Sequence, residues 1–100
     1  MEQLKFDFQE ELTRSAVLRT AASYVTGDRA DEHGDAGDNF GRIASYWEAH
    51  LGVPITSPDV AIMMCLLKLS RINNNTLNMD SWVDGCGYLA LGAELSAKDA

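Results

Sequence analysis

The chain has 100 residues, 46% of them hydrophobic and 23% charged, a balance typical of one globular domain (residues 1–100) rather than a disordered chain. Its formal net charge of −7 argues against direct binding to the phosphates of a nucleic acid, and favours a basic protein partner or a metal-dependent ligand. The N-terminal stretch is acidic and lacks the apolar segment of a signal peptide, so we expect a cytoplasmic protein without a membrane partner.

The N-terminal third is predicted to contain one helix. Residues 1–9 form a lead-in in which the Phe-Asp-Phe alternation is a weak signal for an edge strand. Residues 10–26 have apolar side chains at helical spacing, and Gly27 is in position to end that helix. The side chains expected on its broad apolar face are Val17, Leu18, Ala21, Ala22, Tyr24 and Val25.

An acidic loop is predicted over residues 28–38, and two interpretations of it stay open. It could be a solvated loop whose last residue, Asp38, caps the next helix. Alternatively, its carboxylates could supply oxygen ligands to Mg²⁺ or Mn²⁺. No register of the loop has the ligand, glycine and glutamate positions of an EF-hand, so calcium binding of that kind is excluded.

An amphipathic helix is predicted over residues 39–51, with Gly52 and Pro54 ending it. Its expected buried face consists of Phe40, Ile43, Ala44, Trp47 and Leu51. Asn39 lies at the border of that face, and His50 is best explained as a helix-end histidine because it has no partner at metal-ligand spacing.

The core is predicted to be a helical hairpin over residues 57–95. Ser57 and Pro58 suit the N-cap and first turn of its first arm, which is apolar around most of its circumference. We therefore expect a buried helix with Lys68 and Arg71 sharing one edge. The residues after Glu94 are expected to be frayed.

The second arm of the hairpin is predicted to have two different sides. The core side would contain Trp82, Val83, Cys86, Leu89, Ala90 and Ala93. Asp80, Asp84 and Tyr88 stack at i, i+4 and i+8 on the other side. Glycines at 85 and 92 cost about 1 kcal/mol each in a helix interior, which predicts close approach of the two arms there. Both cysteines are expected to be free thiols.

If the arms are antiparallel, Asp80 and Asp84 lie near Lys68 and Arg71 in one polar patch. A structural interpretation is available for each carboxylate: Asp80 would be a carboxylate in the first helical turn that the helix dipole stabilises, and Asp84 would pair with one of the cations. The alternative is a ligand site, because partly buried ion clusters are costly unless packing or function retains them.

With four helices and short connections, the predicted fold class is all-α, a four-helix bundle-like domain built on the C-terminal hairpin.

Three segments carry a resemblance to known proteins: GDAGDNFGRIASYW, DVAIMMCLLKLSRI and DSWVDGCGYLALGAEL. Over residues 33–95 they resemble a family of small phage and prophage proteins, whose pattern includes an Asn-Phe helix start, a Lys-x-x-Arg helix and an Asp-x-Trp-x-Asp helix. That family is similar in turn to the all-α, MazG-type nucleoside triphosphate pyrophosphohydrolases. The chain has His33 where the family pattern has tyrosine, and it lacks the E-x-x-E helix of active MazG enzymes.

The resemblance implies a homodimer that binds an NTP or dNTP and cleaves its α–β phosphate bond with Mg²⁺ as cofactor. Asp80, Asp84 and Asp35 would hold the metal. Lys68 and Arg71 would contact the phosphates, and Asn39 and Tyr88 would border the nucleotide. The missing E-x-x-E helix, the small size and the charge of −7 favour an alternative: a non-catalytic phage inhibitor of a host defence system, acting as an acidic anti-CRISPR-type binder or as a sponge for a nucleotide signal.

Overall fold

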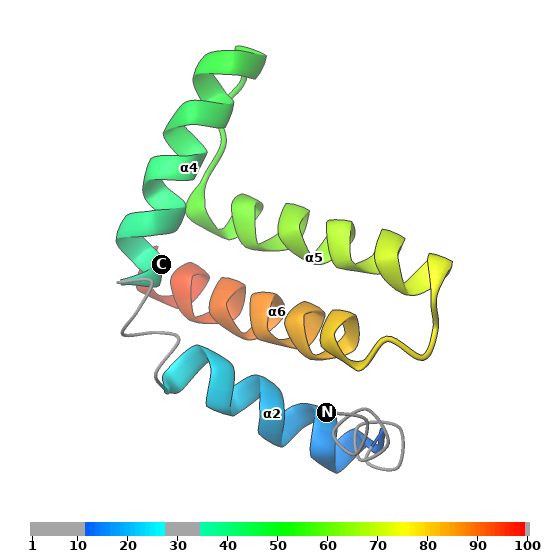
Figure 1. Cartoon of the computed structure of the whole chain (residues 1–100). Coiled ribbons are helices and arrows are strands. Elements are labelled where there is room, and N and C mark those ends of the chain that lie inside the picture. The colour runs from blue at the N-terminus through cyan, green and yellow to red at the C-terminus, as the bar shows by residue number, and fades with distance from the viewer. Residues whose placement is uncertain (1–11, 28–34, 100) are drawn as a thin grey trace.

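The computed structural model describes residues 12–27 and 35–99, and the regular elements of these residues are all α-helices. The four helices, shown in Figure 1, are α2 (Arg14–Thr26), α4 (Ala36–Leu51), α5 (Ser57–Asn74) and α6 (Met79–Asp99). The predicted all-α class is therefore confirmed. The lead-in over residues 1–9, with its Phe-Asp-Phe alternation, lies outside the described residues, as does most of the acidic loop.

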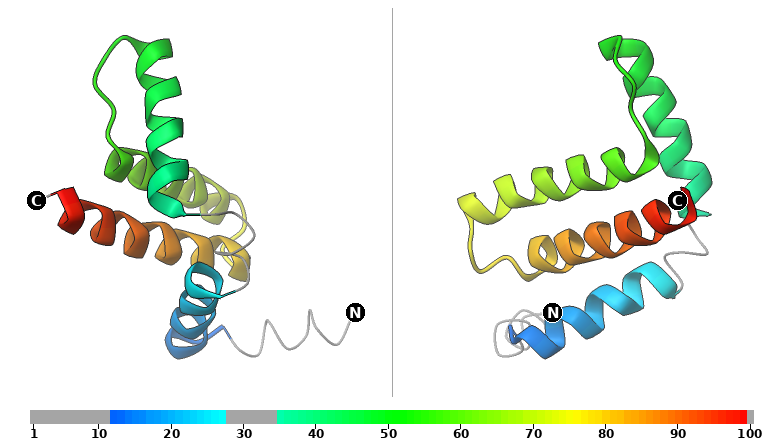
Figure 2. Two further views of the ribbon diagram at one scale, coloured as in Figure 1. Left: turned by 90° about the vertical axis from the view of Figure 1, so that its left-hand side faces the viewer. Right: turned by 180° about the vertical axis from the view of Figure 1, so that it is seen from behind.

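The predicted hairpin is the centre of the fold. Helices α5 and α6 run antiparallel, side by side, and α2 lies against the opposite side of α6 (Figures 1 and 2). Helix α4 rises steeply from the end of the hairpin where α5 begins and α6 ends, instead of running alongside the other helices. The described helices thus form a three-helix layer with a fourth helix crossing one end.

Two groups of buried side chains hold this arrangement together. The first joins three helices and consists of Phe40, Ala44, Val60, Ala61 and Leu95. The second joins α2 to α6 and consists of Ala16, Ala21, Met79 and Val83. Because α6 contributes to both groups, it is the helix on which the other three are positioned.

The sequence predicted close approach of the hairpin helices at Gly85 and Gly92, and the structure shows it at Gly92 but not at Gly85, where an added Cβ would make ordinary contacts. A Cβ atom at Gly92 would lie 3.0 Å from the Cβ of Ala61, and one at Gly85 would lie 3.9 Å from Cys65 Sγ. Gly87 has the same role toward α2, because a Cβ there would lie 3.1 Å from a methyl group of Val25. The close approach is therefore tightest at Gly92.

The prediction that α5 is a buried rod is wrong for the single chain. Val60 and Ala61 are fully buried, but Ile62, Leu66 and Leu69 are 50–56% exposed. The predicted core side of α6 is also wrong in part, because its buried residues face two opposite neighbours instead of one. The residues expected in the core that the structure leaves exposed are Trp82, Leu89, Ala90 and Ala93 in α6, Leu18 and Ala22 in α2, and Leu51 in α4.

Two helix boundaries differ from the predictions, the start of α4 and the end of α6. Helix α4 begins at Ala36 because Asp35, not Asp38, is its N-cap: Gly37 N donates to Asp35 Oδ1 over 2.6 Å. The acidic loop therefore ends before residue 36. Helix α6 continues to Asp99, so the tail expected to be frayed is helical up to that residue.

The cap of α5 is Thr56 rather than Ser57, and it forms a capping box. Asp59 N donates to Thr56 Oγ1 over 3.2 Å, and Thr56 N donates back to Asp59 Oδ2 over 2.9 Å. These two bonds satisfy backbone donors that the first turn would otherwise leave without partners. The bond that Thr56 N donates to the Asp59 carboxylate also favours the ionised form of that carboxylate, and so holds the pKa of Asp59 below its usual value of 3.8.

We expect Thr56→Ala to lower the free energy of unfolding by about 1 kcal/mol, because the N-cap side chain is lost. Thermal and urea unfolding at neutral pH measure this change. Ser45→Ala is the matched control: the Ser45 hydroxyl donates to Gly41 O on the exposed side of α4 and caps nothing. Equal losses in both variants would contradict the capping role.

The same cap gives a pH dependence whose sign is fixed by the lowered pKa of Asp59. A lowered folded-state pKa stabilises the fold above the unfolded-state pKa, and that contribution is lost as the pH falls through the folded-state pKa. The difference in free energy of unfolding between the native chain and Asp59→Ala should therefore have its largest value at neutral pH. It should become smaller in acid, below about pH 4. A difference that grows in acid would contradict this assignment.

Cys65 is buried and Cys86 is partly buried, and both are free thiols, as predicted.

No helix among the described residues is both long enough and apolar enough to cross a bilayer.

Candidate functional site

Two adjoining open cavities lie along α6, and together they form the candidate site. Their volumes are about 780 Å³ and 520 Å³. Tyr24, Lys68 and Asp84 line both cavities, so the two share one wall and form a continuous groove. Helix α5 contributes Lys68, α6 contributes Asp84, and the last turn of α2 contributes Tyr24. Three helices therefore meet at this wall.

The smaller cavity is the polar one. Besides the shared wall, the residues that line it are Arg71, Asn78, Asp80 and Ser81. Asp80 and Asp84 are one helical turn apart on α6, and Lys68 and Arg71 are three residues apart on α5, so each pair lies on one face of its helix. The predicted polar patch of two carboxylates and two cations is thus gathered in one cavity.

An ion pair lies at the centre of the shared wall. Lys68 Nζ and Asp84 Oδ2 are 2.9 Å apart, and their side chains are 17% and 25% exposed. This is the interhelical salt bridge that the structural interpretation of Asp84 predicted. Arg71, by contrast, is exposed and forms no ion pair with any described carboxylate. Within residues 12–27 and 35–99, Arg71 is therefore a cation at this end of the groove that has no ionic partner.

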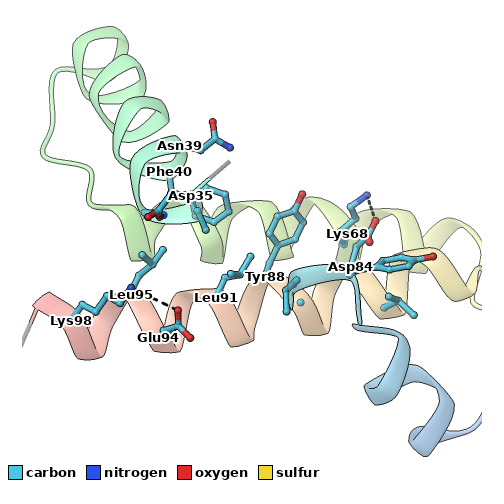
Figure 3. A pocket seen from close by; sticks show the side chains of 16 residues that line it. Asp35, Asn39, Phe40, Lys68, Asp84, Tyr88, Leu91, Glu94, Leu95 and Lys98 are labelled. Atoms are coloured by element: carbon cyan, nitrogen blue, oxygen red, sulfur yellow. Dashed lines mark hydrogen bonds and ion pairs between the residues drawn. The ribbon is translucent and has the colours of Figure 1, made fainter. Parts of the chain in front are cut away.

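The larger cavity has a mixed lining, in which aromatic and aliphatic side chains lie among polar and charged ones. The rings of Phe40 and Tyr88 lie against each other with centroids 6.3 Å apart and planes inclined by 35°. Leu91 and Leu95 of α6 continue this apolar surface, and the side chain of Asn39 projects at the α4 side (Figure 3). The cavity thus combines a surface for a flat apolar group with one amide that can donate and accept hydrogen bonds.

The predicted metal ligands are only partly brought together. Asp80 and Asp84 line the polar cavity, whereas Asp35 lines only the larger one, where its Oδ1 accepts the capping bond from Gly37 N. The described residues contain no group of three or more histidine, cysteine or acidic side chains arranged to hold a metal ion. Two carboxylates still fit Mg²⁺, because it is usually held by one or two carboxylates together with substrate phosphates and water.

All seven predicted site residues line the groove, and so do several residues that were not predicted there. Phe40 and Tyr24 were assigned to helix faces without a site role, and only tertiary packing places them in the groove. Glu94 and Lys98, which lie 3.9 Å apart, also line the larger cavity. A signal for Lys98 did exist, because residues 84, 91 and 98 repeat every seven positions along one side of α6.

Comparison with known protein families gives one match, the domain of unknown function DUF6378, over residues 16–96. These residues include all four helices except for the first two residues of α2 and the last three of α6. All seven predicted site residues therefore fall inside the matched region.

Two phage proteins are similar to the chain. The Gene 55 protein of Mycobacterium phage L5 is 45% identical over 74 residues, and the Gene 55 protein of Mycobacterium phage D29 is 32% identical over 73 residues. Each alignment covers 73% of this chain and 47% or 48% of the relative, so the chain spans about half the length of the curated relatives it matches. No solved structure matches the chain.

Proposed function

The chain belongs to the DUF6378 family of phage proteins, and we propose that its groove binds a nucleoside triphosphate or deoxynucleoside triphosphate together with Mg²⁺. The observation that carries the proposal is the shared wall of the two cavities. It joins a polar cavity with two cations to a larger cavity of mixed lining, in which an aromatic pair lies among polar and charged side chains. A nucleotide has the same two parts, a charged phosphate chain and a flat base.

The polar cavity is the proposed phosphate end. Arg71 offers up to five N–H donors in a planar fork, a shape suited to phosphate oxygens. Lys68 lies on the same face of α5, but its ammonium group already contacts Asp84. A phosphate would share Lys68 with that carboxylate, and Mg²⁺ held by Asp80 and Asp84 would balance the added negative charge. In this proposal Asp35 is a helix cap and the metal ligands are reduced to two.

The larger cavity is the proposed base end. Tyr88 and Phe40 present ring surface on which a base can pack, and Leu91 extends it. Asn39 is partly buried at the edge of this cavity, where its amide can bond to the edge of a base. The chain is too acidic for a polyphosphate to bind by net charge alone, so the local cations and the metal must supply the attraction.

Pyrophosphohydrolysis of the MazG type is the reaction that this groove would support if the metal is held in a catalytic geometry. Metal-dependent cleavage of a phosphate bond needs carboxylates that hold the cation, an oriented water and compensation of developing charge. Two carboxylates and two cations supply part of that set. Binding without turnover would instead support the second candidate, a nucleotide sponge directed at a host signal, in the host cytosol.

Incubation with a panel of NTPs and dNTPs tests the proposal, with pyrophosphate release and thermal shift measured in parallel. We expect at least one nucleotide to raise the melting temperature in the presence of Mg²⁺, with a smaller effect from the matching nucleoside, which lacks phosphates. If the groove is catalytic, pyrophosphate release should be lost in Asp84→Asn without loss of helicity. Asp38→Asn removes the same charge at an exposed residue outside both cavities and should leave binding and turnover unchanged.

Each outcome of this panel has a defined meaning. Turnover that depends on Asp84 supports the enzyme, and a thermal shift without turnover supports the sponge. The absence of any shift and of any turnover, across all the nucleotides, would overturn the nucleotide proposal. A basic host protein would then be the partner to search for, since the acidic surface favours one.

A further inference from the structure

We infer that the N-terminal end of α6 forms a pocket for the terminal phosphate of a polyphosphate ligand, in which the hydroxyl of Ser81 is a donor. The inference rests on the proposed function for the direction in which a nucleotide lies in the groove. It adds what the polar end of the groove recognises, namely the last phosphate of the chain. It also makes Ser81 a residue that distinguishes a nucleoside triphosphate from a monophosphate.

The first observation is the burial of Ser81. Among residues 12–27 and 35–99 it is the only buried polar residue, and it is 3% exposed. Its hydroxyl has no hydrogen-bond partner in that part of the chain, where no side-chain nitrogen or oxygen that is closed off from solvent lacks one. The Ser81 oxygen is therefore not closed off, and it opens into the polar cavity that this residue lines. A buried hydroxyl of this kind is available to a ligand.

Packing explains a small side chain at position 81 but not a hydroxyl. Alanine would occupy nearly the same space, and it has a higher helix propensity than serine. A hydroxyl that is buried without a protein partner also costs free energy of desolvation. The hydroxyl of Ser81 therefore does not stabilise the ligand-free fold, and a molecule in the cavity that accepts its hydrogen bond would offset that cost.

The first turn of α6 adds a backbone donor to the same cavity. The helix has 21 residues and begins at Met79, so its first N–H groups have no carbonyl partner within the helix. Asn78 Oδ1 accepts the N–H of Ser81 over 3.0 Å. The N–H of Asp80, which also lines the cavity, has no acceptor among the described residues. This donor and the positive end of the helix dipole both favour an anion.

The charges around this end favour an anion that arrives with a metal ion. Arg71 lines the cavity from α5, is exposed and has no ionic partner among the described residues. The carboxylates of Asp80 and Asp84 would repel a bare anion, and Lys68 already contacts Asp84. A phosphate that brings Mg²⁺ satisfies both carboxylates and leaves its remaining oxygens for the donors. A simple carboxylate ligand would lack that compensation.

The order of side chains along α6 assigns the terminal phosphate to this end. One stripe of the helix, at spacings of three and four residues, lines the groove. From the N-terminal end it consists of Ser81, Asp84, Tyr88, Leu91, Leu95 and Lys98. Figure 3 shows Asp84, with Lys68 beside it, following Tyr88 along the helix.

The spacing along this stripe decides which nucleotides reach Ser81. Ser81 lies seven residues before Tyr88, which is about 10 Å along the helix axis. Asp84 and Lys68 lie between the two. With a base packed on Tyr88, the first phosphate lies near Lys68 and only a longer phosphate chain extends to Ser81. A monophosphate ends short of this pocket.

Titration calorimetry with the mono-, di- and triphosphate of one nucleoside, at constant Mg²⁺, tests the inference. We expect the native protein to bind the triphosphate about tenfold or more tightly than the monophosphate. Ser81→Ala should weaken triphosphate binding about 10- to 100-fold, the scale of one hydrogen bond to a charged group, and should leave monophosphate binding unchanged. Ser45→Ala is the matched control, because it removes a hydroxyl that lines neither cavity and should change neither affinity.

Thermal unfolding without ligand separates this role from a structural one. Because the Ser81 hydroxyl has no partner among the described residues, Ser81→Ala should not lower the melting temperature of the ligand-free chain. A lower melting temperature would mean that the hydroxyl holds the fold together, and would overturn the inference. An equal loss of affinity for the mono- and triphosphate would also overturn it, because Ser81 would then not read the terminal phosphate.

Inorganic tripolyphosphate distinguishes this inference from the nucleotide proposal, since it has no base. We expect it to raise the melting temperature of the native protein in the presence of Mg²⁺, and to raise that of Ser81→Ala less. This result, without a response to any nucleotide, would remove the nucleotide proposal and leave the phosphate pocket in place. Nucleotide binding that Ser81→Ala does not weaken would remove only the phosphate pocket. The absence of any response to tripolyphosphate and to all the nucleotides would overturn both.

Discussion

Replacing Lys68 by methionine should weaken nucleotide binding about 10- to 100-fold, the scale of losing one hydrogen bond to a charged group. Methionine keeps much of the length and apolar stem of the side chain, so the packing of α5 on α6 should survive. Lys68 lines both cavities, and so the loss should be seen for any nucleotide that spans them. Isothermal titration calorimetry with the nucleotide that gives the largest thermal shift measures the effect.

Lys98→Met is the matched control for this experiment, because it removes the same charge from the far end of the larger cavity. The Lys98 side chain is 67% exposed and its partner Glu94 is 3.9 Å away, so a surface contact of this kind should contribute little. Equal losses in the two variants would mean that general electrostatic attraction, and not a phosphate contact at Lys68, determines the affinity. An unchanged affinity in Lys68→Met would contradict the proposed phosphate end.

Gly92→Leu should lower the free energy of unfolding by about 3 kcal/mol, which corresponds to a fall of roughly 12 °C or more in melting temperature. Even a methyl group there would lie 3.0 Å from the Cβ of Ala61, and both atoms are attached directly to the backbone. Neither helix can relieve that contact by rotating a side chain, so α5 and α6 must separate. The measurement is thermal and urea unfolding at one fixed protein concentration.

Gly85→Ala provides the comparison, because its added methyl group would meet Cys65 and Lys68 at 3.9 Å, an ordinary contact distance. This variant should gain the helix propensity of alanine, up to about 1 kcal/mol, without a steric cost. Destabilisation by Gly85→Ala as large as that of Gly92→Leu would show that glycine at both positions serves something other than close packing.

The helical class and the convergence of the four charged side chains in one cavity could be predicted from the sequence, because both depend on local periodicity. Carboxylates at i and i+4 on one helix, and cations at i and i+3 on its neighbour, converge whenever the two helices form an antiparallel hairpin. Two helix caps were predicted at the wrong residue, Ser57 for Thr56 and Asp38 for Asp35, because several capping residues lie close together in each stretch.

Burial was harder to predict than helicity. A stripe of leucine and isoleucine on α5 predicts a buried face, but the pattern does not say whether the same chain covers it. The structure covers the stripe of Val60 and Ala61 and leaves that of Ile62 and Leu66 exposed. The role of Tyr24 in the groove was out of reach for the same reason, since it depends on where α2 packs.

The attachment of α2 has a consequence for the energetics of the groove. This helix is joined to the domain mainly through one small interface, in which Ala16 and Ala21 meet Met79 and Val83. Small side chains contribute little apolar area, so local opening of α2 should cost less free energy than separation of the α5–α6 hairpin. Tyr24, part of the wall shared by both cavities, would leave the groove in such an opening. A ligand that touches Tyr24 therefore stabilises the closed form, and its measured affinity includes the free energy of keeping α2 in place.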